Sequence, residues 1–306
     1  MNGDVIAIAV AICWTLSAIF FEFGSRKIGS LNLNPIRLFF GIVMLGCTLA
    51  CINGHFFPVG ADTRSWVLMS FSGLIGFVLG DYFLFASYTM ITARFSQLFM
   101  TLAPLFTALF SYLLLSERLT WLSMLGMLVT LFGIGISVFS KGEEGSGPVK
   151  FTLPFKGVAY AIIGAFGQGF GLVLSKLGMN AYEAVYSCDN ALYIPLASTQ
   201  IRAITGVICF LVIILLRGGA KDFMQSLHDR KGVMLTFFGS IFGPFVGVTL
   251  SLLAVQHSNT AVASTIMAMV PVVILLPDKY LFKRKVSLIQ VAGAVISVIG
   301  VSLFFV

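Results

Sequence analysis

The residue best suited to carry chemistry is Asp81, which lies within Gly80-Asp81-Tyr82-Phe83, deep in a long apolar stretch. A charged side chain costs free energy in hydrocarbon, so an ionisable residue there is a functional candidate by default. Because a low-dielectric surrounding disfavours the charged form of a carboxyl, Asp81 is suited to carry a coupling proton. A structural hydrogen bond to a neighbouring helix is the alternative. We predict a role for Asp81 in substrate binding or coupling, with Tyr82 beside it as a further candidate.

Three other charged residues lie near the ends of apolar stretches. Glu22 is about one turn from the end of the first stretch, and Arg37 opens the second stretch on the same side. A structural ion pair between Glu22 and Arg37 is the preferred interpretation, and a role in gating or substrate binding is the alternative. Arg37 and Arg202 are expected near opposite membrane faces. Long basic side chains there extend to the lipid headgroups, so binding of an anionic cargo is the second interpretation for both.

Glycines recur at a spacing of four inside three apolar stretches. Small residues at this spacing let two helix backbones approach closely. We interpret these glycines first as packing positions and second as places where packed helices can slide while the protein rocks. The three motifs are Gly76-x-x-x-Gly80, Gly167-x-x-x-Gly171 and Gly243-x-x-x-Gly247.

Two further side chains are candidates to line a cavity, and three prolines are candidates to shape it. Gln168 lies among the glycines of its stretch, and Trp14 lies in the first stretch. Pro104, Pro244 and Pro271 each remove a backbone hydrogen bond inside a predicted helix. We therefore predict a kink at each proline, where freed carbonyl groups can face a cavity.

No arrangement typical of an enzyme is present in the sequence. The three histidines are scattered in loops, and G-x-S-x-G, H-E-x-x-H and phosphate-binding patterns do not occur. The five cysteines show no C-x-x-C spacing, which argues against a disulfide framework and a metal site. We therefore predict no catalytic residue, no metal and no cofactor.

The elements that must position the candidates are membrane-spanning helices. The chain has 306 residues, of which 58% are hydrophobic and 10% charged, with a mean hydropathy of +1.00, whereas soluble domains carry about a quarter charged residues. A membrane crossing needs about 20 mostly apolar residues. The net charge of +7 reflects basic loops that set topology, not a nucleic-acid site. The ten predicted spans are residues 5–24, 36–52, 65–90, 95–115, 119–140, 155–177, 195–216, 233–255, 261–281 and 286–305.

An internal repeat divides these spans into two sets. Five spans is an odd number, so a second copy of five must enter the membrane from the opposite side. We predict an all-α membrane protein with ten transmembrane helices arranged as two inverted five-helix repeats, an architecture typical of secondary transporters. The repeats are predicted at residues 1–141 and 155–306, joined by a linker at 142–154. Residues that match at one offset of 167 are Gly76 with Gly243, Gly80 with Gly247, Met100 with Met267, Pro104 with Pro271, Gly126 with Gly293 and Gly133 with Gly300.

A family resemblance extends over nearly the whole chain. It is carried by the order of several short motifs, which are Trp14 with Ser17-Ala18, Asn34-Pro35-Ile36-Arg37, the glycines Gly73, Gly76 and Gly80, Leu102-Ala103-Pro104, Leu114-Leu115-Ser116-Glu117-Arg118-Leu119, and Gly126 with Gly133. In these the sequence resembles the EamA-type transporters of the drug/metabolite transporter superfamily. The resemblance implies secondary transport of small metabolites, often export, through a cavity walled by the first four helices of each half.

Two features depart from the family pattern. Where the second repeat of the family commonly has a Glu that matches Glu117, this chain has Lys283-Arg284-Lys285. The family places both termini in the cytoplasm, but 15 of the 19 Lys and Arg residues follow odd-numbered spans. The positive-inside rule would then place both termini outside. The orientation stays open, with a slight preference for the charge count.

The function predicted from these features is secondary transport of a small metabolite, amino acid or drug-like molecule by alternating access, with proton coupling or exchange. A membrane-embedded enzyme or an interaction subunit without transport activity is the alternative, although Asp81 stands alone in the sequence without the cluster of His, Asp or Ser that an enzyme needs. The expected partners are a small-molecule substrate and membrane lipid, not nucleic acid. The expected location is the plasma (inner) membrane, crossed several times, and a monomer is among the forms that fit.

Overall fold

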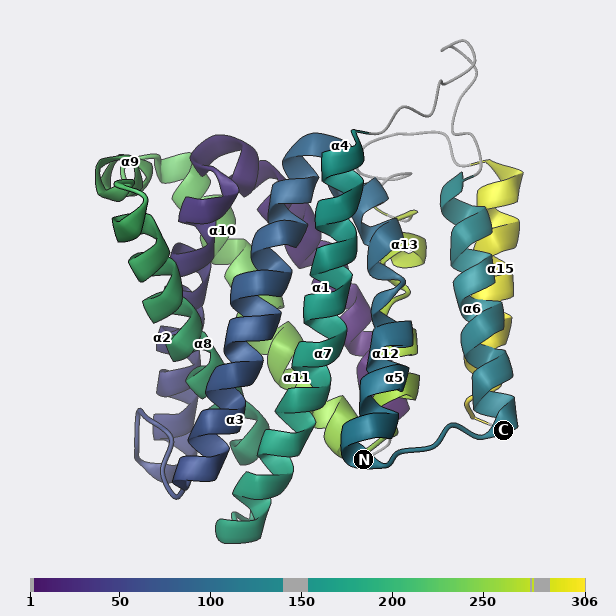
Figure 1. The fold of residues 1–306 in the computed structure, drawn as a ribbon, viewed down its shortest axis with the longest axis horizontal. Helices are drawn as coiled ribbons and strands as arrows, with labels where there is room; N and C mark the ends of the chain where they lie inside the picture. Colours follow the sequence, from purple (N-terminus) through teal and green to yellow (C-terminus); the bar gives the residue numbers. More distant parts are fainter. Residues whose placement is uncertain (1–2, 140–153, 276, 278–286, 306) are drawn as a thin grey trace.

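The structure is a computed structural model that describes residues 3–139, 154–275, 277 and 287–305. Every regular element in these ranges is a helix (Figure 1). Residues 142–153 of the predicted linker and the Lys283-Arg284-Lys285 segment lie outside the described residues.

The first half of the chain forms a series of long apolar helices. α1 and α2 are separated by a single residue, Gly29, whose φ of 79° is left-handed and favours glycine. The helices of this half are α1 (Gly3–Ile28), α2 (Ser30–Asn53), α3 (Thr63–Gly73), the π-helix η1 (Leu74–Asp81), α4 (Tyr82–Met100), α5 (Ala103–Leu115) and α6 (Trp121–Phe139).

The second half follows a similar order of elements, with one more short helix, α9, at its surface and with two helices, α11 and α12, in the place of α4. Its first helix runs on to Val185 and so takes up half of the connection that the hydropathy pattern places at 178–194. The helices are α7 (Phe155–Val185), α8 (Tyr193–Leu216), α9 (Ala220–Ser226), α10 (Arg230–Ser240), the π-helix η2 (Ile241–Phe245), α11 (Val246–Gln256), α12 (Thr260–Met267), α13 (Val270–Val273) and α15 (Leu288–Ser302).

Seven helical segments are long and apolar enough to cross a membrane. Three more apolar helices, Trp121–Ser137, Thr260–Val273 and Leu288–Ser302, are shorter than a full crossing within the described residues. The all-α membrane architecture is therefore confirmed, and the count of ten spans stays a prediction.

The chain reverses direction within α4. The hydroxyl groups of Ser87 and Ser96 are 2.7 Å apart, and Gln97 donates a hydrogen bond to the Tyr88 hydroxyl at 2.6 Å. Residues nine apart in a straight helix would be about 13.5 Å apart along its axis. The segments before Ile91 and after Phe95 are accordingly two separate candidate spans.

Two of the three predicted proline kinks, those at Pro104 and Pro271, prove to be helix breaks, whereas Pro244 lies inside the π-helix η2. α4 ends at Met100 and α5 begins at Ala103, and α12 ends at Met267 and α13 begins at Val270. Pro104 and Pro271 each occupy the first turn of the new helix, where a proline loses no helical hydrogen bond. The prediction of a mid-helix kink is wrong for this reason, but the two breaks lie at positions related by the offset of 167.

The glycine motifs bring α7 against α3 and η1. A Cβ atom on Gly167 would lie 2.6 Å from the Gly80 Cα atom, and one on Gly171 would lie 2.8 Å from the Gly76 Cα atom. Gly247 instead makes room for the Trp14 ring, 2.9 Å from the place of its missing Cβ atom. The glycines of α7 thus allow two helix backbones to approach closely, whereas Gly247 makes room for an aromatic side chain.

α6 and α15 form a separate antiparallel pair at the edge of the molecule (Figure 1). Near the middle of the pair, Ser297 Oγ donates to the Thr130 carbonyl at 3.3 Å. The missing Cβ atoms of Gly126 and Gly133 would lie 2.9 Å from the Gly300 carbonyl oxygen and 2.7 Å from the Gly293 carbonyl oxygen. Thr130 and Ser297 are themselves 167 residues apart. The counterparts of Gly126 and Gly300 at this offset are Gly293 and Gly133, so the second glycine contact is the first with the two halves exchanged.

Candidate functional site

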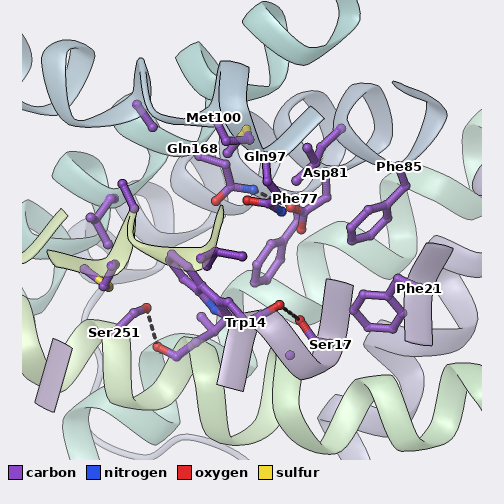
Figure 2. A pocket seen from close by; sticks show the side chains of 18 of the residues that line it. Trp14, Ser17, Phe21, Phe77, Asp81, Phe85, Gln97, Met100, Gln168 and Ser251 are labelled. Atoms are coloured by element: carbon purple, nitrogen blue, oxygen red, sulfur yellow. Dashed lines mark hydrogen bonds between the residues drawn. The ribbon is translucent and has the colours of Figure 1, made fainter. Parts of the chain in front are cut away.

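A cavity of about 100 Å³ lies between the two halves of the chain. Its walls come from α1, α2, η1, α4 and α5 in the first half, and from α7, α8, η2, α11, α12 and α13 in the second. α6 and α15 contribute no described residue to it. Figure 2 shows Asp81 and Gln168 on one wall, with Trp14 and Ser251 across from them.

Asp81 is the acidic centre of the cavity, and both of its oxygens are occupied. Arg37 Nη2 forms a salt bridge with Oδ2, and Gln168 Nε2 donates to Oδ1. Gln168 belongs to α7, so this contact joins the two halves. Arg37 is held in turn by Asn34, whose Oδ1 accepts a hydrogen bond from Nε at 2.9 Å. Asp81 is therefore linked to a guanidinium and an amide on two other helices.

Glu22 does not pair with Arg37. Its carboxylate accepts from Arg26 Nη2 at 2.8 Å, one turn further along α1, because residues four apart on a helix are immediate neighbours. Arg37 is only 2% exposed and lies inside the protein. The predicted ion pair at the interface is thus replaced by two separate pairs.

Arg202 is the second buried guanidinium of the cavity, with 3% of the residue exposed. Its Cζ atom lies 4.5 Å from the centre of the Phe77 ring. Among the described residues, Nε has no hydrogen-bond partner and no carboxylate forms a salt bridge with this arginine. Asp81 attracts it only at longer range.

The expectation that both arginines extend to the lipid headgroups is also wrong. α2 begins at Ser30 and α8 begins at Tyr193, so Arg37 and Arg202 lie about two turns inside their helices. Their helices pack against each other. The two side chains consequently meet the same cavity instead of opposite membrane faces.

Aromatic and uncharged polar residues complete the walls, and several were not predicted from the sequence. Phe77 and Phe85 contact the guanidinium of Arg37, with ring centres 5.4 and 4.9 Å from Cζ. Tyr88 and Gln97 are hydrogen-bonded to each other across the reversal in α4. One sequence signal was available: Gln97 and Ser264, both in the wall, are related by the offset of 167.

Of the predicted site residues, the structure brings together Trp14, Arg37, Asp81, Gln168 and Arg202 around the cavity. Two others lie outside it. Glu22 is paired on the surface of α1, and the Tyr82 hydroxyl accepts from Arg217 Nη1 at 3.3 Å at an exposed position.

A polar network joins the two halves beyond one end of the cavity. Glu117, in the connection after α5, accepts from the Thr260 amide at 2.8 Å and from the Thr260 hydroxyl at 3.0 Å. It also forms a salt bridge of 2.6 Å with Lys176, which donates to the Ser258 carbonyl at 2.8 Å. The same end of the molecule carries both chain termini (Figure 1).

Comparison with known proteins identifies a family and a fold. The model of the EamA-like transporter family matches residues 1–139 and again 155–306. An uncharacterized transporter of Synechocystis is 20% identical over 79% of this chain and 66% of its own length. An uncharacterized transporter of Clostridium kluyveri is 23% identical over 64% of this chain and 58% of its own length. The matches thus span about two thirds of these relatives or less.

A solved crystal structure shares the fold, with a TM-score of 0.62 at 15% identity over 99% of this chain and 95% of that one. This likeness concerns the fold alone. Since the family model covers both halves, the chain is a multi-pass integral membrane protein of a transporter family, not an enzyme. The chain belongs to the EamA-like transporter family.

Proposed function

We propose that this protein is a secondary transporter that carries a small metabolite, amino acid or drug-like molecule by alternating access, with export as the expected direction. The observation that carries the proposal is the cavity between the halves, in which Asp81 of the first half accepts from Gln168 of the second. A substrate held there contacts both halves at once. Motion of one half against the other would then expose it to each side in turn.

The contact of α6 with α15 supports ten spans in two inverted repeats. Two glycine contacts lie on either side of Thr130 and Ser297. When each glycine is replaced by its counterpart at the offset of 167, one contact becomes the other. Such self-complementary pairing is what a two-fold axis produces between equivalent surfaces. Antiparallel helices require that axis to lie perpendicular to them, in the plane of the membrane.

The network around Glu117 supports a gate at the end that carries the termini. Its salt bridge with Lys176 links the two halves. In the register of the repeat the counterparts of these residues are Arg284 and Lys27. Both counterparts are basic, so they cannot form the same ion pair with each other.

Asp81 is the proposed coupling group, in proton-driven transport or in exchange. Its carboxylate binds Arg37 and Gln168. Protonation would remove the charge that holds Arg37 and would weaken the link between the halves. A proton could thereby change which conformation is preferred.

The test is transport in proteoliposomes, after metabolite profiling of cells with and without the protein has named a substrate. We expect saturable counterflow from the wild-type protein. Asp81→Asn should lose proton-driven transport and retain exchange. Arg217→Gln removes an exposed arginine and is the matched control. Counterflow absent from the wild-type protein would favour the alternative of an interaction subunit, and an unchanged pH dependence in Asp81→Asn would remove Asp81 from coupling.

We place the protein in the plasma (inner) membrane, and reporter fusions at Val306 test its orientation.

A further inference from the structure

The charges that line the cavity do not cancel. The described lining residues include two guanidinium groups, Arg37 and Arg202, and one carboxylate, Asp81. Arg37 and Asp81 form a salt bridge. Among the described lining residues one positive charge, that of Arg202, is therefore unbalanced.

An unpaired charge in this position is costly. Removal of an ion from water costs free energy unless partners replace its hydration. Arg202 has an aromatic ring beside it and an Nε group without a partner among the described residues. The absence of a side chain at Gly76 makes room for the guanidinium, since a Cβ atom there would lie 2.9 Å from Arg202 Nη2.

We infer that the cavity binds a small organic monoanion through a carboxylate that pairs with Arg202. The inference rests on the proposed transport function and names the class of its substrate. A planar guanidinium matches a carboxylate with two parallel hydrogen bonds. One negative charge balances the cavity, and the aromatic walls formed by Trp14 and Phe77 accept an apolar body.

The same charges disfavour a zwitterionic amino acid. An amino acid has no net charge and leaves the excess positive charge uncompensated. Its ammonium group would need a carboxylate, but both oxygens of Asp81 are occupied by Arg37 and Gln168. The cavity thus selects a carboxylate that lacks an ammonium group.

Binding can be measured apart from transport, because one of the three tryptophans lines the cavity. A protein with Trp66→Phe and Trp121→Phe retains Trp14 as its single tryptophan. The probes are matched sets of similar shape: pyruvate, L-alanine and methyl pyruvate, then 4-methyl-2-oxopentanoate and L-leucine. We expect a saturable change of fluorescence with at least one oxo acid, at least tenfold weaker binding of the matching amino acid, and no binding of the ester. The matching thermal shift is measured in the wild-type protein.

Two variants test the role of Arg202. Arg202→Gln should weaken binding of the oxo acid at least tenfold, and Arg202→Lys should restore part of it; Arg217→Gln should leave it unchanged. Because Arg202→Gln can also disturb folding, a second variant adds a charge instead of removing one. Val248 is the counterpart of Asp81 at the offset of 167 and lines the same cavity. Val248→Asp supplies the missing partner of Arg202 and should abolish binding of the anion, whereas the neutral Val248→Asn should keep it.

The outcomes separate the two proposals. Equal or tighter binding of an amino acid, binding of the ester, or an oxo acid affinity unaffected by Val248→Asp overturns the inference. So does the lack of any response to the oxo acids. Counterflow of a zwitterion, cation or neutral compound in the same liposomes would leave transport standing without this substrate class. Absence of counterflow despite tight binding of the oxo acid would overturn transport and keep the binding site.

Discussion

Arg37 and Arg202 occupy equivalent positions in the two halves of the chain, and their surroundings differ. Both are buried, and both lie beside the Phe77 ring. Arg37 is paired with Asp81, whereas the position that would supply the partner of Arg202 holds Val248. Duplication explains why there are two arginines. The single difference in their partners leaves one of them available for a ligand.

The comparison also separates structural from functional charge. A buried pair with satisfied hydrogen bonds holds helices together, and its net contribution to stability can be near zero. A buried charge without a partner costs stability unless something else binds it. A function that needs this charge would explain why the cost is retained at Arg202.

The largest effect is expected from breaking the paired side of the comparison. Asp81→Ala leaves Arg37 buried without a counter-charge, which costs about 3–5 kcal/mol. Chemical denaturation in detergent, followed by tryptophan fluorescence, measures the free energy of unfolding. The double variant Asp81→Ala with Arg37→Met removes both charges and should recover most of the loss. If Asp81→Ala alone costs less than about 1 kcal/mol, the value of an exposed pair, Asp81 and Arg37 do not form the buried pair described here.

A smaller effect is expected at Gly76, which lies against the unpaired Arg202, and at Gly243, the counterpart of Gly76 in the second half. Gly76→Ala places a methyl group against Arg202 Nη2, and Gly243→Ala places one 3.0 Å from the Phe21 ring. An added methyl group in a filled site costs about 1–3 kcal/mol. Gly76→Ala should weaken oxo acid binding more than Gly243→Ala does, although Gly243 lines the cavity, because only Gly76→Ala displaces the guanidinium. Equal loss of binding in both variants would show that the cavity responds to crowding in general.

Hydropathy and the repeat predicted much of the fold, but not the partners inside the cavity. The all-α membrane class follows from composition, and the close packing of Gly76 and Gly80 on α7 follows from spacing. Arg37 was expected at the membrane interface because its apolar run begins at residue 36, whereas α2 begins about two turns before Arg37, in polar sequence. This error in depth led to the expectation of headgroup contact for Arg37. Arg202 lies about two turns inside its predicted span of 195–216, so hydropathy had already placed it below the interface.

Long-range pairing is a separate reason for the remaining errors. Asp81 is 44 residues from Arg37 and 87 residues from Gln168 along the chain. No local pattern links such residues. The partner of Glu22 is Arg26, one turn away on the same helix, and not Arg37 of the next apolar stretch. The repeat contained a clue that composition did not: Asp81 has no acidic counterpart at Val248.

The smallest effect is expected where the two halves agree. Asp62 and Asp229 are 167 residues apart and cap equivalent helices, α3 and α10. Asp62 accepts from the Ser65 amide and hydroxyl, whereas Asp229 accepts from the Gly232 amide. Asp62→Ala and Asp229→Ala should each lower the Tm slightly, with the larger shift at Asp62 because it loses two hydrogen bonds. Asn also caps helices, so Asn at either position should retain the Tm near neutral pH.

The cap at Asp62 also predicts a pH dependence. The hydrogen bonds donated by the Ser65 side chain and amide lower the pKa of Asp62 below its ordinary value. A carboxylate with a lowered pKa stabilises the folded state fully above its unfolded pKa of about 4, and this stabilisation is lost as the pH falls through the lower folded value. The Tm difference between wild type and Asp62→Asn should therefore change only below about pH 4, measured in detergent from pH 2 to 7. A difference that changes mainly near pH 6 would have to come from another group.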